Sequence, residues 1–295
     1  MGTRPAARAV VFGYGDIGVR CLGALLDAGV EVPLVVTHRD DPNEARWYAS
    51  LADFAKTRGA RLMVDPMPGE LEQEVENIHP DLFFSFYYRS MLPASLLRHA
   101  KKGAFNMHGS LLPKYRGRAP LNWAILHGEK ETGVTLHAMT EKPDAGGIVD
   151  QQAVPIGPDE TAVQVFRKMT DAAVRVLDRN LPSLVDGNVK LKANDLSQGS
   201  YFGRRTPEDG RIDWSRSAKE IHDLVRAVAP PFPGAFCVFQ GKSLKVNKTK
   251  IDDQKKPPAG ALGPYREGGE WFAACGDGKV LRLLEVEPQG RTAQK

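Results

Sequence analysis

The stretch "AVVFGYGDIGVRCLGALLDAGVEVPLVVT", Ala9 to Thr37, sets two short runs rich in β-branched residues on either side of a longer apolar stretch. The runs Ala9–Phe12 and Val32–Thr37 predict strands, and Ile17–Ala28 between them predicts a helix. Two strands joined by a crossover helix form a βαβ unit, in which the strands run parallel. The stretch therefore predicts an α/β fold with a mostly parallel sheet.

The same alternation of strand and helix signals continues beyond this unit. A longer helical stretch, Thr161–Leu181, spaces its apolar residues so that one stripe can pack on a sheet. Further strands are predicted at Arg61–Val64, Leu82–Phe86, Ala104–Met107 and Val134–Ala138, and further helices at Asn43–Arg58, Leu71–Ile78, Ala94–Ala100 and Pro120–His127.

The composition changes near Asn188. From there to Arg205 the sequence is polar and poor in strand signals, which is typical of a linker. A helix at Ser217–Val228 is followed by short β-like runs between Gly, Pro and Lys, and these predict a small β-barrel. The runs are Ala235–Phe239, Ser243–Val246, Trp271–Ala274 and Val280–Val286. We therefore expect an α/β domain over residues 1–190, a linker over 191–206 and a barrel over 207–295.

The overall composition excludes several classes. A formal net charge of +4 over 295 residues is too small for the dense basic surface that nucleic-acid binding requires. The N-terminus has no apolar core of signal-peptide length, and no eighteen consecutive residues are apolar, so we expect a cytoplasmic protein without a membrane span. Cys21, Cys237 and Cys275 have no metal-site or disulfide spacing, so we expect reduced thiols and no metal.

A glycine motif follows the first predicted strand. Gly13, Gly15 and Gly18 form G-x-G-x-x-G at a strand-to-helix turn, with Asp40 and Asp41 some two dozen residues on. This context is compatible with a dinucleotide site, in which pyrophosphate rests on the helix N-terminus. The alternative is that the glycines only allow a sharp turn. We favour the turn.

The chemistry is indicated at "FNMHGSLLPKYRGRAP", Phe105 to Pro120. Side chains alternate along a strand, so Asn106 and His108 project to one face. An amide can donate to a developing oxyanion and an imidazole can move a proton, which suits acyl transfer. Asp144, in "EKPDAGGIVD", supplies a carboxylate that would orient His108 and raise its pKa. The Ala-Gly-Gly that follows would let a substrate approach closely.

Each of these residues also has a structural interpretation, so the prediction depends on their joint pattern. Asn106 and Asp144 are common turn formers, and Ser110 is expected to bond local backbone rather than act as a nucleophile. The remaining histidines are expected to be structural: His38, His79, His99, His127, His137 and His222.

Four segments resemble the folate-dependent formyltransferases, and the resemblance covers nearly the whole chain. They are "FNMHGSLLPKYRGRAPLNWAI", "ETGVTLHAMTEKPDAGGIV", "FGRRTPEDGRIDW" and "RAVAPPFPGAF". The family includes methionyl-tRNA formyltransferase and the formyltransferase domain of the bifunctional polymyxin-resistance protein ArnA. The resemblance implies a Rossmann-like domain with helices on both faces, followed by an OB-like barrel, and 10-formyltetrahydrofolate as the formyl donor.

The resemblance also implies roles for individual residues. Asn106 would stabilise the oxyanion, His108 would act as general acid and base, and Asp144 would tune that histidine. Folate contacts would come from Ser90, Met91 and Leu92, from Arg118, and from Thr140, Glu141, Lys142, Pro143 and Asp144.

The acceptor amine is expected to belong to a nucleotide sugar. Residues 208–295 hold 15 Lys and Arg against 12 Asp and Glu, an excess too small for the basic tRNA-binding domain that the tRNA enzymes use. Resemblance to ArnA at "SFYYR" and "FGRRTPEDG" points to UDP-4-amino-4-deoxy-L-arabinose, and so to lipid A modification and polymyxin resistance. Arg204 and Arg205 could bind its diphosphate or simply hold the linker.

Alternatives from other classes stay open. A methionyl-tRNA formyltransferase is the second candidate, and an NAD(P)-dependent enzyme using the glycine motif is the third. A homo-oligomer or a partner dehydrogenase is possible, because 295 residues leave no room for ArnA's second domain.

Overall fold

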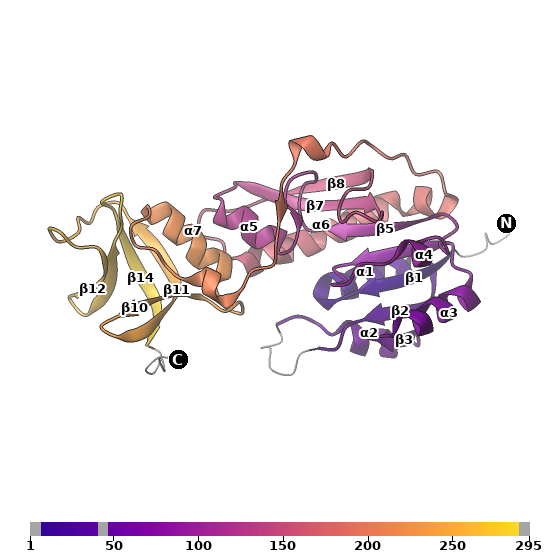
Figure 1. Ribbon diagram of the computed structural model, residues 1–295, viewed down its shortest axis with the longest axis horizontal. Helices are drawn as coiled ribbons and strands as arrows, with labels where there is room; N and C mark the ends of the chain where they lie inside the picture. The colour runs from indigo at the N-terminus through magenta and orange to yellow at the C-terminus, as the bar shows by residue number, and fades with distance from the viewer. Residues whose placement is uncertain (1–6, 41–46, 289–295) are drawn as a thin grey trace. The chain divides into compact units, whose positions relative to one another are not determined.

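The computed structural model describes residues 7–40 and 47–288. Contacts divide the chain into two compact units (Figure 1). Unit 1 comprises Met1–Gly117, Gly133–Val154 and Arg167–Tyr201. Unit 2 comprises Arg118–Thr132, Pro155–Phe166 and Phe202–Lys295. Two segments that precede residue 190, Arg118–Thr132 and Pro155–Phe166, thus pack with the C-terminal part.

Unit 1 is built on a seven-stranded sheet of order β3-β2-β1-β4-β5-β7-β8. The first five strands in this order are parallel, and β7 runs antiparallel to β5. The mostly parallel sheet is therefore confirmed, and its strand order reverses between β1 and β4, where open α/β sheets bind ligands. The strands are β1 (Arg8–Gly13), β2 (Glu31–Thr37), β3 (Arg61–Val64), β4 (Leu82–Phe86), β5 (Gly103–His108), β7 (Glu131–Ala138) and β8 (Ile148–Pro155).

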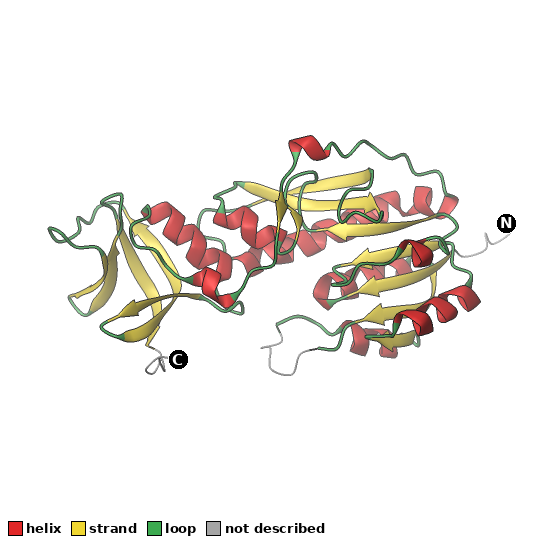
Figure 2. Ribbon diagram, in the orientation of Figure 1, coloured by secondary structure: helices red, strands yellow, loops and turns green. Residues whose placement is uncertain are grey.

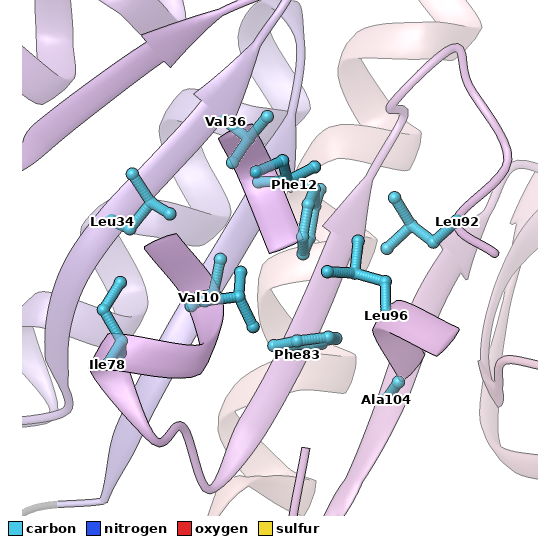
Figure 3. Close-up of a cluster of buried hydrophobic side chains, with 11 residues drawn as sticks. Val10, Phe12, Leu34, Val36, Ile78, Phe83, Leu92, Leu96 and Ala104 are labelled. Atoms are coloured by element: carbon cyan, nitrogen blue, oxygen red, sulfur yellow. The ribbon is translucent and has the colours of Figure 1, made fainter. Parts of the chain in front are cut away.

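Helices cover both faces of this sheet, as predicted (Figure 2). On one face α3 (Pro68–Ile78) and α4 (Ala94–Leu97) pack against side chains such as Val10, Phe12 and Phe83 (Figure 3). The alternate strand residues point to the other face, where α1 (Gly15–Asp27) packs against α2 (Leu51–Thr57). An ion pair of 3.1 Å between Arg20 and Asp171 joins α1 to the long helix α6 (Ala162–Asp186).

Two helices differ from the sequence prediction. Residues 43–46 of the predicted Asn43–Arg58 helix lie outside the described residues, and the helix begins only at Leu51. Ser50 caps it by accepting from the Asp53 N–H, so a local polar signal overrides the apolar spacing before it. At its other end α6 continues through Pro182 to Asp186, five residues past the predicted end.

The glycine motif has a packing explanation. A Cβ on Gly13 would lie 2.8 Å from Leu51 Cδ2, and one on Gly18 would lie 3.1 Å from the same atom. Gly15 has a positive φ of 60°, and the ring of Tyr48 packs over it. Asp16, in the first turn of α1, accepts from the Ala49 N–H at 2.6 Å. The turn and the close packing of α2 thus account for all three glycines.

Unit 2 contains a five-stranded antiparallel sheet of order β10-β11-β14-β13-β12. Among the described residues the end strands β10 and β12 do not pair with each other, and β10 has only an isolated bridge to Arg211 on its outer side, so the sheet is a half-barrel rather than a closed barrel. The sheet was predicted except for β12, whose sequence GPYRE carries little apolar signal, and for the second half of β11, which continues to Asp252, beyond the predicted end at Val246. Its strands are β10 (Ala235–Phe239), β11 (Lys242–Asp252), β12 (Gly263–Glu267), β13 (Glu270–Ala274) and β14 (Val280–Pro288), accompanied by the helices α5 (Pro120–Leu126) and α7 (Ala218–Val228).

The stretch predicted as a linker carries structure of its own. Lys192 bridges to Ile148, and a short 3-10 helix, η1, follows at Leu196–Gln198. Then β9 (Tyr201–Phe202) pairs with β6 (Arg116–Gly117), so this stretch lies against the loop after β5. A second 3-10 helix, η2, spans Pro207–Gly210. The polar composition therefore marked an irregular segment held by backbone pairing.

Candidate active site

The predicted amide and imidazole lie at the carboxyl end of β5. This strand sits between β4 and β7, with Asn106 opposite His137 and His108 opposite Thr135 in the register with β7. Alternation along β5 places Asn106 and His108 on one face, as predicted. Asn106 is half-buried, whereas His108 is buried.

His108 is held by a backbone carbonyl. Its Nε2 lies 2.8 Å from the carbonyl oxygen of Tyr115, which can only accept, so Nε2 carries a proton and donates. Nδ1 then faces Asp144, whose Oδ1 lies 3.3 Å away. The structure thus brings His108 and Asp144 together from two separate segments, as the sequence predicts.

Two separate segments of the chain hold Asp144 and its loop. Its Oδ2 accepts from the Gly117 N–H at 2.9 Å, and its backbone has a positive φ of 52°. The Asn194 side chain holds the loop by donating to the carbonyls of Asp144 and Gly146, at 3.0 and 3.1 Å. A Cβ on Gly146 would lie 1.8 Å from the carbonyl oxygen of Ala138. Gly146 therefore has a packing reason of its own, because the loop lies against β7, and the approach of a substrate to this loop stays a prediction.

His137 lies beside the predicted catalytic residues, and both of its ring nitrogens are hydrogen-bonded, as expected of a structural histidine. Its Nδ1–H donates to the carbonyl of Ala138 at 2.9 Å, which leaves Nε2 as an acceptor for Asn106 Nδ2 at 3.1 Å. The same Nε2 lies 3.6 Å from Asp144 Oδ1. The signal that could have found it is the pairing of two predicted strands, which sets His137 beside Asn106.

The pKa directions in this cluster follow from burial and from charge. Burial lowers the pKa of His108 below its usual value, and the Asp144 carboxylate and the Tyr115 carbonyl only partly oppose it. The expected rise is thus reversed, because desolvation of the imidazolium is the larger effect. Burial alone would raise the pKa of Asp144, but the neighbouring imidazoles of His137 and His108 and the hydrogen bond from the Gly117 N–H hold it at about 2. At neutral pH the pair is a neutral imidazole beside a carboxylate.

Ser110 has the structural role that the sequence predicts. Its hydroxyl donates to the carbonyl of Lys114 at 2.6 Å, and its own carbonyl accepts from Thr135 Oγ1 at 2.6 Å. These bonds shape the turn after His108. The neighbouring Gly109 is equally constrained, because a Cβ there would lie 2.0 Å from the Tyr87 hydroxyl.

The residues predicted to contact folate fall into two loops and one isolated position. Ser90 and Met91 are exposed after β4, but Leu92 is only 4% exposed and points into the cluster shown in Figure 3. Leu92 can therefore offer a ligand only its backbone. Thr140 to Pro143 form an exposed turn closed by a bond from Thr140 Oγ1 to the Lys142 carbonyl. Arg118 belongs to unit 2, and its N–H donates to Phe202.

The two arginines predicted to bind diphosphate also belong to unit 2. Arg204 is exposed, and Arg205 lies over the ring of Trp123 at 4.7 Å while donating to the Asp209 carbonyl. This geometry gives Arg205 a local structural contact, and its diphosphate role stays a prediction.

Family comparison places this arrangement in a known group. Residues 7–181 match the formyl transferase family, and residues 204–295 match the C-terminal domain of formyl transferases. The chain belongs to the formyl transferase family. The predicted family and the enzyme class are therefore confirmed.

Solved structures share the fold. The N-formyltransferase from Helicobacter canadensis, solved with folinic acid and dTDP-3-aminofucose, is 22% identical with a TM-score of 0.74, over 94% of this chain and 99% of that one. WlaRD, a sugar 3N-formyl transferase solved with dTDP and 5-N-formyl-THF, is 22% identical with a TM-score of 0.75, over 98% and 100%. HypX from Aquifex aeolicus, solved with tetrahydrofolic acid, is 20% identical with a TM-score of 0.67, over 96% of this chain and 46% of that one.

The described residues hold neither a metal-binding cluster nor a membrane-spanning helix. In residues 7–40 and 47–288, no three His, Cys, Asp or Glu side chains are grouped to hold a metal ion. Over the same ranges, every helix is too short or too polar to pass through a bilayer.

Proposed function

We propose that this chain transfers a formyl group from 10-formyltetrahydrofolate to the amine of a nucleotide sugar. The observation that carries the proposal is the meeting of Asn106, His108 and Asp144 at the end of β5, within a formyl transferase fold. The donor supplies the carbonyl carbon that the amine attacks. The reaction also requires that the oxyanion is stabilised and that one proton is moved. Residues of this chain perform both steps.

The proton enters His108 at Nδ1. Nε2 already carries a hydrogen because it donates to the Tyr115 carbonyl, and the lowered pKa leaves Nδ1 unprotonated at neutral pH. When Nδ1 takes a proton from the amine, the new N–H can donate to Asp144 Oδ1, which lies 3.3 Å away and is already ionised. Asp144 thus stabilises the imidazolium that the reaction forms. The ring can afterwards return this proton to the leaving nitrogen.

Asn106 is oriented to stabilise the oxyanion. One N–H of its amide is used by His137 Nε2, which fixes which end of the amide is nitrogen. The second N–H of Nδ2 is then free to donate to a developing negative charge. A donor set in advance in this way needs no rearrangement during the reaction.

The two loops predicted to bind the donor both begin beside one hydrophobic cluster of unit 1. Leu92 follows Ser90 and Met91, and Met139 precedes Thr140. Both Leu92 and Met139 pack on the same hydrophobic cluster of unit 1, so the two exposed segments start from one region of the surface. The second segment ends at Asp144, beside His108. The residues present therefore fit a folate whose reactive end reaches this pair.

For the acceptor we propose UDP-4-amino-4-deoxy-L-arabinose, formylated in the cytoplasm for lipid A modification. The support is the sequence resemblance to ArnA at "SFYYR", "KYRGRAPLNWA" and "FGRRTPEDG". Two solved structures of this fold were crystallised with a dTDP-sugar or with dTDP. Arg204 and Arg205 are the proposed diphosphate contacts. A partner dehydrogenase and a second copy of the chain remain predictions of the resemblance.

The test is a formyl-transfer assay with purified protein and 10-formyltetrahydrofolate. Release of tetrahydrofolate is followed with the UDP-aminoarabinose, with a dTDP-aminosugar, and with charged initiator tRNA. The expected result is turnover with the UDP sugar, and an Asn106→Ala variant slower by about 10²- to 10³-fold as the control. Turnover with the dTDP sugar alone would retain the sugar class and reject the specific acceptor. Turnover with tRNA alone would reject the proposal.

A further inference from the structure

The backbone of Tyr115 holds the catalytic imidazole from one side. Its carbonyl receives the His108 Nε2–H at 2.8 Å, and the residue is buried with a positive φ of 56°. A residue with a side chain rarely adopts this conformation, so surrounding contacts must maintain it. The question is which contacts these are.

The segment before Arg204 provides the contacts that maintain the backbone conformation of Tyr115. Ser200 Oγ accepts from the Tyr115 N–H at 2.9 Å, and the Ser200 carbonyl accepts from the Arg116 N–H at 2.9 Å. The Ser200 N–H donates in turn to the Pro113 carbonyl at 3.3 Å. A Cβ on the preceding Gly199 would lie 2.3 Å from that same carbonyl oxygen, so the two segments are in close backbone contact.

We propose that Ser200 is a positioning residue for His108, acting through the backbone of Tyr115. The inference rests on the proposed role of His108 in formyl transfer. The Ser200 hydroxyl fixes the Tyr115 N–H, which fixes the Tyr115 peptide and aims its carbonyl at Nε2. That bond keeps the proton on Nε2 and leaves Nδ1 to exchange the proton of the reaction. The segment between the α/β sheet and Arg204 thus sets the tautomer of the catalytic ring.

The direction of the effect on His108 follows from its neighbours. The titratable groups that face the ring are Asp144 and His137, and the Tyr115 carbonyl is the third influence beside burial. The carbonyl favours the charged ring because it accepts a hydrogen bond from it. Loosening Tyr115 therefore shifts the titration of His108 further toward acid.

The experiment compares Ser200→Ala with Ser200→Thr, which retains a hydroxyl. The alanine variant is expected to lower kcat about fivefold, the size of one lost hydrogen bond, and to leave the KM for the formyl donor unchanged. The acidic limb of its kcat profile moves to lower pH, and threonine restores both. Ser197→Ala is the matched control, because the Ser197 hydroxyl donates to Asp195, the N-cap of η1, rather than to Tyr115.

A nuclear magnetic resonance titration of the His108 ring nitrogens gives a readout independent of activity. In folded Ser200→Ala protein the ring should titrate at lower pH than in the wild type. If alanine unfolds the protein, Ser200→Cys keeps the size with a weak acceptor and should show the same shift. Wild-type titration and kcat in these variants would overturn the inference. If His108→Ala retains full activity while the shift is present, the proposed function fails and the positioning role stands.

Discussion

The two units each bury a cluster of charged groups with a histidine, and the clusters differ in how many of their hydrogen-bonding atoms are used. In unit 2, Arg226 donates to Asp223 and to the carbonyls of Gly157 and Glu160, while Lys219 contacts the second oxygen of Asp223. Beside them His222 accepts from Thr249 and donates to Pro158. Both of its ring nitrogens are occupied.

In unit 1, His108 Nδ1 and one N–H of Asn106 are left for a reacting group. Nδ1 faces a carboxylate rather than a donor, and among the described residues no hydrogen bond contacts Asn106 Oδ1. Asp144 and Tyr115 hold this arrangement with backbone in the left-handed region. A fully paired cluster stabilises a fold, whereas a cluster with an unused acceptor and donor can perform chemistry.

Replacing His108 gives the largest expected effect. His108→Ala removes the group that moves the proton, so kcat for formyl transfer should fall by about 10²- to 10⁴-fold. Steady-state release of tetrahydrofolate measures it. His99→Ala serves as the control, because His99 lies 3.9 Å from Glu72 in an ordinary surface pair. A fall in kcat of less than tenfold would contradict the proposal that the cluster of unit 1 is catalytic and the cluster of unit 2 is structural.

Breaking the cluster of unit 2 should affect stability without affecting chemistry. Arg226→Met leaves Asp223 buried beside Lys219 alone, and removing one partner of a buried pair costs about 3–5 kcal/mol of the free energy of unfolding. Denaturant unfolding of the purified variant measures this cost. Arg216→Met removes an exposed pair of the same region and should cost under about 1 kcal/mol. A catalytic defect in folded Arg226→Met protein would contradict the structural role.

Acid should destabilise unit 1 in two stages. The folded-state pKa of His108 lies below its unfolded value of about 6.5, so its contribution is complete above that pH and is lost as pH falls below it. The Asp144 contribution is present above about 4 and is lost as pH falls toward about 2. Each proton taken up on unfolding gives a slope of at most about 1.4 kcal/mol per pH unit.

The check is the free energy of unfolding of unit 1 between pH 5 and 8, for the wild type and for His108→Gln. The glutamine variant should show a smaller slope, since it has no imidazole to protonate. Equal slopes in the two proteins would mean that His108 is not held in its neutral form.

Replacing His137 should give the smallest of these effects on kcat. His137→Phe removes the acceptor that orients the Asn106 amide, and the loss of one hydrogen bond should lower kcat about fivefold. His137→Gln, whose side-chain oxygen can still accept, should retain more activity. If the phenylalanine variant is as fast as the wild type, His137 is structural after all.

The sheet and most of the site could be predicted because they follow from local patterns. Alternation along β5 aligned Asn106 with His108, and the spacing of apolar residues predicted the main strands and helices of unit 1 except β8, which was missed. The role of His137 could not be predicted, because it depends on the register between β5 and β7. The contacts of Tyr115 and Gly117 depend on a loop folding back on the chain, which no periodicity encodes.

The direction in which the pKa of His108 is shifted is another property that could not be predicted from the sequence. A nearby carboxylate was predictable from sequence, and it does favour the charged ring. The burial that outweighs it depends on everything packed around the ring, including residues distant in the chain. A short sequence pattern can therefore indicate which groups meet. It does not decide whether the pKa of a group among them is raised or lowered.

The central claim is that Asp144 stabilises the proton taken up at His108 Nδ1. The most direct measurement is the single-turnover rate of formyl transfer by Asp144→Asn at saturating 10-formyltetrahydrofolate. The account predicts a loss of about 10²-fold or more, with donor binding retained, because a neutral amide cannot stabilise the imidazolium. A rate within a fewfold of the wild type would contradict it.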